Sequence, residues 1–310
     1  MKELTRIDQG WKRYELESVD EILDVLNDKK WQRKKDKKGN FLLEKYWICH
    51  GQGEFGKLIP SFEYKPWKDS SRANKLRVER NSIEKFRNKI ETQYKKNGKF
   101  AKVLINCQTS ITTLLYMRHF KVDTRFLDWS VDPFVSAYFA ATCENENDNG
   151  EIWCFDGIEY QNRGAKQWKK YPRTTYLYSG ISEEWNIEMP TAFELDNLYE
   201  DWFVCYFYTA YYNSFPRLKA QHALWSFTPK FNVDHANSII KLVGEDHCCC
   251  YTFQPGLKQD LLDRIKSIKN CYTRKGYYEE TLYPKEINSD EIKKIAEDIK
   301  RKVFTDDLYS

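Results

Sequence analysis

The clearest alternation of apolar and polar positions lies near the middle of the chain. Residues 124–129 are rich in β-branched and aromatic side chains, which favours a short strand. Pro133 suits the first turn of a helix, and an apolar helix is expected from there to about Cys143. Arg125 and Asp128 are charged residues inside this otherwise apolar strand. Because a buried ion is destabilising unless it is paired, both need a partner or a function.

The same periodicities predict elements on both sides of this segment. Strands are expected over 41–49, 151–156, 201–209, 238–243 and 248–253, and helices over 18–26, 73–96, 108–120, 257–268 and 288–303. Residues 157–200 are the least regular part, with aromatic and charged residues interleaved. That composition is typical either of a surface that holds single-stranded nucleic acid or of a lid-like loop packed by its own aromatics, and we favour the loop.

Composition describes a folded protein with a mild positive charge. Hydrophobic residues make up 41% of the 310 positions, enough for a core and too many for a disordered chain. The net charge of +4 is weaker than a dedicated nucleic-acid binder normally carries. No stretch approaches the roughly 18 apolar residues of a membrane helix, and the N-terminus has no apolar signal segment, so a cytoplasmic protein without membrane contact is expected.

The absence of several metal-binding and catalytic motifs from the sequence narrows the range of possible functions. The nine cysteines form no Cys-x-x-Cys pair, and neighbours in the run Cys248 to Cys250 would face opposite sides of a strand. Reduced, mostly buried thiols and no metal site are therefore expected. The Walker, Gly-x-Gly-x-x-Gly, His-Glu-x-x-His and Gly-x-Ser-x-Gly patterns are missing from the sequence, which argues against kinases, dehydrogenases, zinc peptidases and serine hydrolases.

A set of residues in the central segment keeps a fixed spacing: His119, Thr124, Arg125, Leu127, Asp128, Trp129, Ser130, Pro133, Phe139 and Ala140. This spacing resembles the central motif of the FRG-domain family, Gln-His-Tyr-Gly-x-Pro-Thr-Arg-Leu-Leu-Asp-Trp-Thr-x-x-Pro, which is followed by an apolar helix ending near Phe-Ala. The name-giving Phe-Arg-Gly motif is similar to Cys49-His50-Gly51, followed here by Gln52. His50 stands where the family usually has Arg.

Two further segments extend the resemblance to about residues 46–295. A His-Gly pair at the end of a core strand is similar to the NAD-gripping pair of the diphtheria-toxin and poly-ADP-ribose-polymerase branch of ADP-ribosyltransferases. Arg217, Gln221 and Trp225 resemble a later family segment, although Ala223 replaces its Gly. In ADP-ribosyltransferases the third motif strand bears Glu or Gln, and Gln221 is our candidate for that position. The segment 279–284 is similar to the family's closing Thr-Leu-Phe-Pro.

The resemblance implies an α+β fold with an ADP-ribosyltransferase-like split antiparallel β-sheet core and flanking helices. We expect a helical arm over residues 1–40 and one domain over 41–310, because no break in composition marks a second domain. The implied activity is mono-ADP-ribosyl transfer from NAD, without a metal. The implied catalytic residues are His50, Asp128 and Gln221, and the implied NAD-binding residues are Gly51, Gln52, His119, Arg125, Trp129, Ser130 and Tyr138.

Each role has a physical reason. The bond between nicotinamide and ribose breaks through an oxocarbenium-like state, which a nearby carboxylate such as Asp128 stabilises. Asp128 is also a candidate base for activating the acceptor. Arg125 suits the pyrophosphate, His50 a ribose hydroxyl, and Trp129 or Tyr138 the pyridinium ring. The backbone at Gly51, which has no Cβ, can approach the carboxamide closely.

Structural alternatives remain open for the same residues. Arg125 and Asp128 suit an ion pair that ties strand to helix, or separate partners, and Asp128 also suits a cap on the following turn. Gln221 suits a buried amide that satisfies backbone groups, and His119 suits the negative end of a helix dipole.

FRG-family proteins occur in bacterial toxin and phage-defence loci, so the resemblance implies a toxin held by a neutralising antitoxin protein. The acceptor is RNA or protein, and the basic bias slightly favours RNA. Two other functions are open: a non-catalytic nucleotide-sensing or RNA-binding module, and a nuclease that uses His119, Asp128 and His222.

Overall fold

The structure is a computed structural model of the 310-residue chain. It describes residues 1–4, 10–28, 47–53, 57–63, 69–98, 100, 110–143, 145–168, 204–206, 216–228, 231–270, 275–284 and 289–306.

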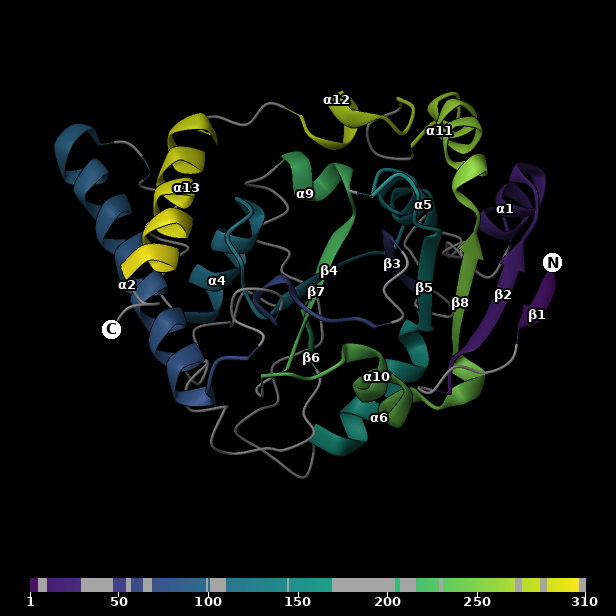
Figure 1. The fold of residues 1–310 in the computed structure, drawn as a ribbon, viewed down its shortest axis with the longest axis horizontal. Coiled ribbons are helices and arrows are strands. Elements are labelled where there is room, and N and C mark those ends of the chain that lie inside the picture. Colours follow the sequence, from purple (N-terminus) through teal and green to yellow (C-terminus); the bar gives the residue numbers. More distant parts are fainter. Residues whose placement is uncertain are drawn as a thin grey trace, which may run out of the picture.

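The described strands form one sheet of eight, in the order β1-β2-β8-β5-β3-β4-β7-β6 (Figure 1). Their bounds are Lys2–Leu4 (β1), Lys12–Leu16 (β2), Trp47–Gly53 (β3), Phe126–Ser130 (β4), Gly150–Asp156 (β5), Val204–Tyr206 (β6), Ala223–Phe227 (β7) and Cys248–Phe253 (β8). Neighbouring strands pair antiparallel, except that β2 runs parallel to β8. The sheet and its helices confirm the expected α+β class.

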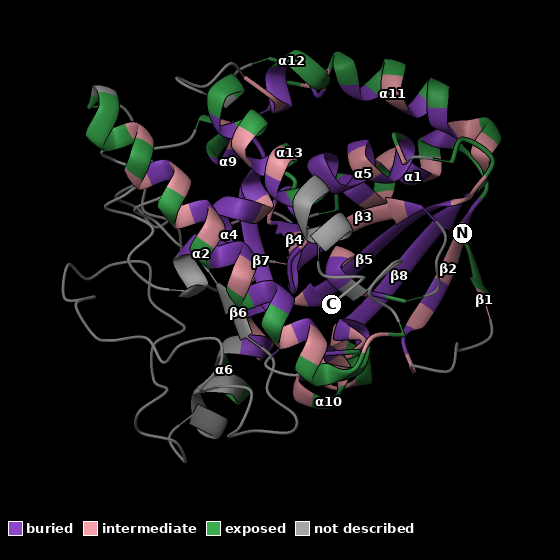
Figure 2. Cartoon of the chain, turned by 60° about the vertical axis from the view of Figure 1, so that its left-hand side comes forward, coloured by how far each residue is buried: buried purple, intermediate pink, exposed green. Residues whose placement is uncertain are grey.

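Helices cover both faces of the sheet (Figure 2). Their bounds are Val19–Leu26 (α1), Arg72–Asn97 (α2), Ser110–His119 (α4), Pro133–Ala141 (α5), Gly157–Trp168 (α6), Pro216–Ala220 (α9), His235–Val243 (α10), Lys258–Lys266 (α11), Glu279–Leu282 (α12) and Ser289–Asp306 (α13), with short 3₁₀ turns at Ser61–Glu63, Glu245–His247 and Pro255–Leu257. All described helices are too short or too polar to cross a lipid bilayer.

Two apolar clusters hold the layers together. Helices α1, α5 and α11 pack with Cys49, Ile152 and Tyr251 on one face of the sheet. On the other face, α6 and α10 pack with Trp153 and Phe155, and the same cluster extends to α2, α4 and α13 near β7.

The central helix α5 begins where the sequence predicts. Pro133 occupies its first turn, and the Asp132 carboxylate caps it by accepting a hydrogen bond from the Phe134 amide at 3.0 Å. Its apolar side chains pack on the β3 and β5 side of the sheet. The predicted pair of a short strand and an apolar helix is therefore confirmed, with the strand running from Phe126 to Ser130.

Two sequence predictions about elements are wrong. Residues 238–243 were expected to form a strand but lie in helix α10, which Asp234 caps by accepting from the Ala236 amide at 2.9 Å. Their β-branched residues favour a strand, but Ala236, Ile239 and Val243 recur at helical spacing and are all buried. The start of the irregular segment is also helical, over α6, and residues 169–200 lie outside the described residues.

The N-terminal arm belongs to the same sheet as the rest. Helix α1 is confirmed, and the Ser18 hydroxyl caps it by accepting from the Glu21 amide at 3.2 Å. Strands β1 and β2 were not predicted, because their mixed charges hide the alternation. Since β2 pairs with β8, the arm is not a separate helical unit. The expected boundary at residue 40 lies outside the described residues.

The join between β3 and β4 divides the sheet. These two strands share a single register pair, Cys49 with Ser130. By contrast, β3 pairs with β5 along residues 47–53, and β4 pairs with β7 along residues 126–130. Beyond that pair, residues 50–53 of β3 and residues 126–129 of β4 continue without a further register pair. We call this stretch the β3–β4 opening.

Candidate functional site

His50 lies at the start of the β3–β4 opening. Its ring Nδ1 lies 2.5 Å from the backbone oxygen of Asp128. A carbonyl oxygen only accepts, so Nδ1 carries the proton. Burial lowers the pKa of His50; the hydrogen bond to Asp128 and the Asp128 charge oppose this without reversing it. The lowered pKa favours the neutral ring near pH 7, and Nε2 lies against Gln52 Oε1 at 3.3 Å.

Asp128 presents a partly exposed carboxylate beside the same opening. Its side chain is 47% exposed, and Oδ2 accepts from the Arg118 Nε at 2.8 Å and Nη2 at 2.5 Å. Arg118 also donates to the Ser61 hydroxyl at 3.0 Å. Burial alone would raise the pKa of Asp128, but the charge and hydrogen bonds of Arg118 outweigh it, and Arg217 and His50 add to the lowering. Asp128 is thus an anion held in place by a guanidinium.

Gly51 is required by helix packing. A Cβ built on Gly51 would lie 1.8 Å from the Ser136 backbone oxygen and 2.9 Å from the Ala140 backbone nitrogen, both in α5. The space left by the missing side chain is therefore filled by α5. The expectation that it admits a carboxamide is wrong for that side of the strand.

Gln52 connects His50 to a buried ion pair. Its Nε2 donates to the Lys57 oxygen and to Glu151 Oε2, both at 3.1 Å, and its Oε1 lies 3.3 Å from His50 Nε2. Glu151 Oε2 also accepts from the Trp153 indole at 2.9 Å. Glu151 Oε1 lies 2.8 Å from an Arg13 guanidinium nitrogen. The sequence prediction included Gln52 and neither member of this ion pair.

Arg125 has a structural role. It is 1% exposed and forms a two-pronged ion pair with Glu79 of α2, at 2.9 and 2.7 Å. Its guanidinium also lies over the rings of Phe227 and Phe231. The expected contact with a pyrophosphate is wrong for this position, and the structural alternative, with separate partners for Arg125 and Asp128, fits instead.

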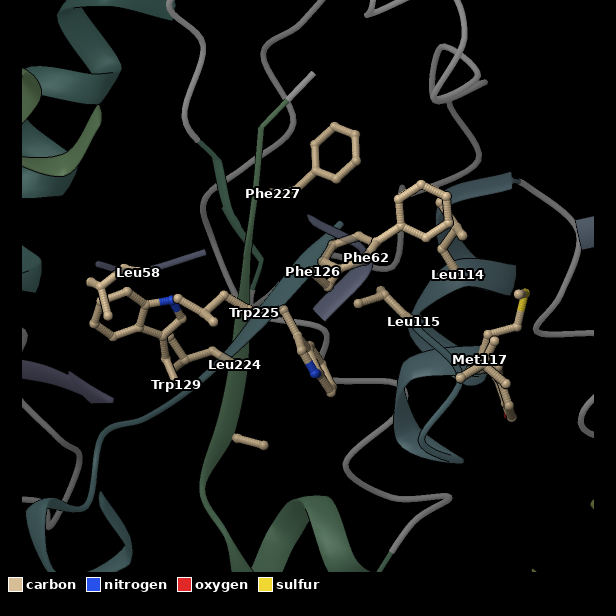
Figure 3. Close-up of a cluster of buried hydrophobic side chains, with 14 of the residues drawn as sticks. Leu58, Phe62, Leu114, Leu115, Met117, Phe126, Trp129, Leu224, Trp225 and Phe227 are labelled. Atoms are coloured by element: carbon tan, nitrogen blue, oxygen red, sulfur yellow. The ribbon is translucent and has the colours of Figure 1, made fainter. Parts of the chain in front are cut away.

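The side chains of Trp129 and Ser130 also make contacts within the fold. The Trp129 indole donates to the Ser226 hydroxyl at 2.7 Å, and Figure 3 shows the side chain within the buried cluster that includes Leu58 and Leu224. It contacts the His50 ring, with centroids 5.5 Å apart, but is too buried to stack on a pyridinium. The Ser130 hydroxyl donates to the Gln221 oxygen and accepts from the Asp132 amide, which fixes the turn before α5.

His119, at the end of α4, and Tyr138, in α5, are both buried. The His119 backbone oxygen accepts from Arg217 at 2.7 Å, which orders the end of α4. Burial, with Glu279 nearby, raises the pKa of Tyr138 to about 12, so its hydroxyl stays protonated. Because Tyr138 packs within the α5 cluster, it is not free to stack on a ligand ring.

Gln221 precedes β7 and lies away from the opening. Its side-chain amide donates to the Leu282 oxygen at 3.0 Å, and the residue is 7% exposed. In the β4–β7 register, Ser130 pairs with Ala223 and Asp128 with Trp225. Gln221 therefore lies beyond the closed end of the β3–β4 opening, and the structure does not bring it to His50 and Asp128. The alternative, a buried amide that satisfies a backbone group, fits this position.

Sequence reasoning missed Arg118 as a site residue. The family motif has Gln at this position, so the change to a cation beside His119 was the available signal. Arg217 was noticed, but its charge near Asp128 was not. Arg217 lies over the Tyr283 ring, 4.6 Å from its centroid. The two arginines form a cationic border along the Asp128 side of the opening.

The nuclease alternative would need a group of side chains that can hold a metal. Within the described ranges, no group of three or more His, Cys, Asp or Glu side chains is arranged to hold a metal. His222 is buried, with Nδ1 4.0 Å from Asp132 Oδ2. Cys248, Cys249 and Cys250 are buried in β8, as their strand spacing indicated.

Asp132 is expected to make stability fall as pH rises. Burial raises its pKa to about 6, despite hydrogen bonds from Tyr277 and the Phe134 amide. The pKa of Asp132 in the folded state exceeds its value in the unfolded state, which is near 3.9. The stabilisation that the protonated carboxyl gives the folded state is therefore complete below about pH 4 and is lost by about pH 6 to 7. Asp132→Asn keeps the cap and should remove this change, on the order of 3 kcal/mol, from urea midpoints measured across that range. Parallel profiles for both proteins would contradict it.

Fold and site together define an α+β protein with a neutral histidine and an anionic aspartate at a break in its central sheet. Residues 46–149 match the family model described as FRG domain. The chain matches no curated protein and no solved structure.

Proposed function

We propose that this protein transfers ADP-ribose from NAD to an acceptor. One observation carries the proposal: the three segments that resemble ADP-ribosyltransferase motifs come together in the sheet. The strand of His50, the strand of Asp128 and the strand that follows Gln221 are direct neighbours, in the order β3-β4-β7. They are far apart in sequence, so the fold rather than the chain order brings them together.

The geometry of the opening supports the same chemistry. Breaking the nicotinamide–ribose bond builds positive charge on the sugar, which a fixed anion stabilises. Arg118 keeps Asp128 ionised and oriented, and the lowered pKa makes its carboxylate a weak base. Its proposed role is therefore electrostatic, and proton removal from the acceptor falls to another group. His50, whose ring lies against the backbone of Asp128, is the proposed neighbour of a ribose hydroxyl.

We assign the cationic part of the proposed NAD site to Arg118 and Arg217 instead of Arg125. Both lie close enough to Asp128 to lower its pKa. Arg118 is in α4, which contacts β4, and Arg217 is in α9, which contacts β7. A guanidinium is always charged and suits the oxygens of a pyrophosphate. The split of the sheet into two halves at one register pair supports the ADP-ribosyltransferase-like core that the sequence suggests.

For the biological role, we propose a cytoplasmic toxin of a bacterial toxin–antitoxin or phage-defence system, held by a neutralising antitoxin protein. The FRG domain supports this context through the family resemblance. RNA is the favoured acceptor over protein, because the net charge is +4 and two arginines border the opening.

The test is transfer of label from adenylate-labelled NAD to a whole-cell lysate that is afterwards divided into protein and RNA fractions. We expect label in the RNA fraction with the wild type, and none with heat-denatured protein. Label in the protein fraction would change the acceptor class while keeping the reaction. A wild-type protein that binds NAD but labels neither fraction would contradict the transferase.

A second candidate is a non-catalytic nucleotide-sensing or RNA-binding module. It is favoured by the third segment, in which α9, β7 and the residues between them contain no Asp or Glu, and the Gln221 amide is buried. This candidate predicts saturable NAD binding, measured by calorimetry, with no labelled product. The two functions thus differ in the labelling result and agree in the binding result.

A further inference from the structure

Lys258 is a buried cation at the start of helix α11, where it is only 6% exposed. Its ammonium group donates to the backbone oxygens of Asn145 at 3.3 Å and Glu146 at 3.4 Å, and to Cys143 Sγ at 3.0 Å. A buried ammonium is costly unless an anion pairs with it. Within the described part of the chain, these contacts include no carboxylate, and the sulfur is the only one of the three acceptors that can ionise.

Cys143 directly follows the C-terminal cap of α5 and is partly exposed. The other described cysteines are buried, namely Cys49, Cys154, Cys248, Cys249 and Cys250. The Cys143 thiol donates to the Asn145 oxygen at 3.3 Å, and a Cβ built on Gly53 would lie 3.2 Å from its sulfur. Because susceptibility to oxidation follows exposure, a small oxidant from solvent should react with Cys143 before it reacts with the buried cysteines.

The hydrogen bonds of Lys258 also have a structural role, since they tie the turn after α5 to the start of α11. Backbone oxygens are sufficient for that role. The sulfur adds a chemical property, because a cysteine oxidised to sulfenic acid condenses with a neighbouring nitrogen to give a sulfenamide. The lysine amine is such a nitrogen once it has lost its proton, and its four-carbon side chain is flexible enough to close the remaining distance.

We propose that Cys143 and Lys258 form a redox-sensitive modification site, at which a hydroperoxide oxidises the cysteine and the lysine captures it as a sulfenamide. In the first step, hydrogen peroxide oxidises the thiol to sulfenic acid and is itself reduced to water. In the second step, Lys258 Nζ forms a bond to Cys143 Sγ, the S–O bond breaks, and one water molecule and one proton leave. A dithiol reverses the link by restoring the thiol and the amine, and is itself oxidised to a disulfide.

The link would have two consequences for the protein. It joins the end of α5 to the start of α11, on the face of the sheet where α5 backbone atoms lie against Gly51. It also protects Cys143 from further oxidation to sulfinic acid, which thiols do not reverse. Neither consequence depends on the proposed reaction with NAD.

The test treats the full chain with hydrogen peroxide and measures its intact mass and a peptide map prepared without reductant. Formation of the sulfenamide removes two hydrogens, so we expect a mass loss of about 2 Da. In the map, the peptides that contain Cys143 and Lys258 should be joined, and trypsin should no longer cleave after Lys258. Dithiothreitol should restore the original mass and both separate peptides.

Lys258→Arg is the variant that separates the chemistry from the contact. Arginine keeps the positive charge and the hydrogen bonds, but its guanidinium stays protonated and is not a nucleophile. No link should form, and Cys143 should instead react with dimedone or gain roughly 16 or 32 Da as sulfenic or sulfinic acid. Lys266→Arg, at the exposed other end of α11, should form the link as the wild type does.

Several outcomes would overturn the proposal. These are a wild type in which Cys143 is joined to another cysteine, one in which it reaches sulfinic acid as readily as in Lys258→Arg, and one in which it stays unoxidised. A link that retains an oxygen atom overturns the direct S–N bond. If Lys258→Arg fails to fold, the peptide map of the wild type decides alone. NAD is not used, so failure here is distinct from failure of the proposed transferase.

Discussion

Asp128→Asn is expected to reduce label transfer from NAD by about 10²- to 10³-fold, the usual effect of removing one preorganised electrostatic contact to a transition state. The change removes the negative charge and keeps the shape, and the Asn oxygen still accepts from Arg118. Binding of NAD should change little, because the charge acts on the sugar only as positive charge develops during cleavage. The measurement is the initial rate of label transfer beside the affinity for NAD.

Asp20→Asn is the matched control. Asp20 lies in α1, carries the same charge and pairs with Arg264 at 2.9 Å, and its side chain is 78% exposed. Its transfer rate should stay within about twofold of the wild type, since a surface ion pair contributes little. Equal losses of transfer rate in both variants would mean that the overall charge of the protein, rather than the position of Asp128, determines the rate. An active Asp128→Asn would remove Asp128 from the catalytic set.

The strong local patterns predicted the elements around this site correctly. Pro133 and the apolar run behind it predicted α5, and the aromatic strand before it predicted β4, because both signals depend on residues close in sequence. Strand β2 was missed because Arg13 has its partner on β5, and a pairing between distant strands leaves no local pattern. The same reason hid the parallel pairing of β2 with β8.

Site residues were harder to predict than elements. His50 and Asp128 lie together as the motif order suggested, but Arg125 and Trp129 from the same motif point into the core. Residue type cannot distinguish a structural residue from a ligand-binding one. In the sequence, an arginine that pairs with a glutamate across the core looks the same as an arginine that binds a phosphate. Burial decides between them, and burial depends on which helix packs on the strand. A fixed spacing therefore identified the fold of this segment better than its chemistry.

Gly51→Ala is expected to destabilise the protein by on the order of 3 kcal/mol or more, because the added methyl group would overlap the Ser136 backbone oxygen. Backbone atoms cannot rotate away as the end of a side chain can, so α5 as a whole has to shift from β3. That shift also moves the turn that follows Asp128, and any protein that remains folded should transfer less label. Urea unfolding followed by circular dichroism measures the first effect.

Gly256→Ala provides the comparison. A Cβ at Gly256 meets no atom within 4 Å, so its unfolding midpoint should stay close to the wild type. A large effect at both positions would point to lost backbone freedom rather than to packing. If Gly51→Ala is as stable as Gly256→Ala, then α5 does not lie directly on β3. In that case the glycine of the His-Gly pair would have to be explained by a ligand after all, and the carboxamide contact expected from the sequence would return as the leading explanation.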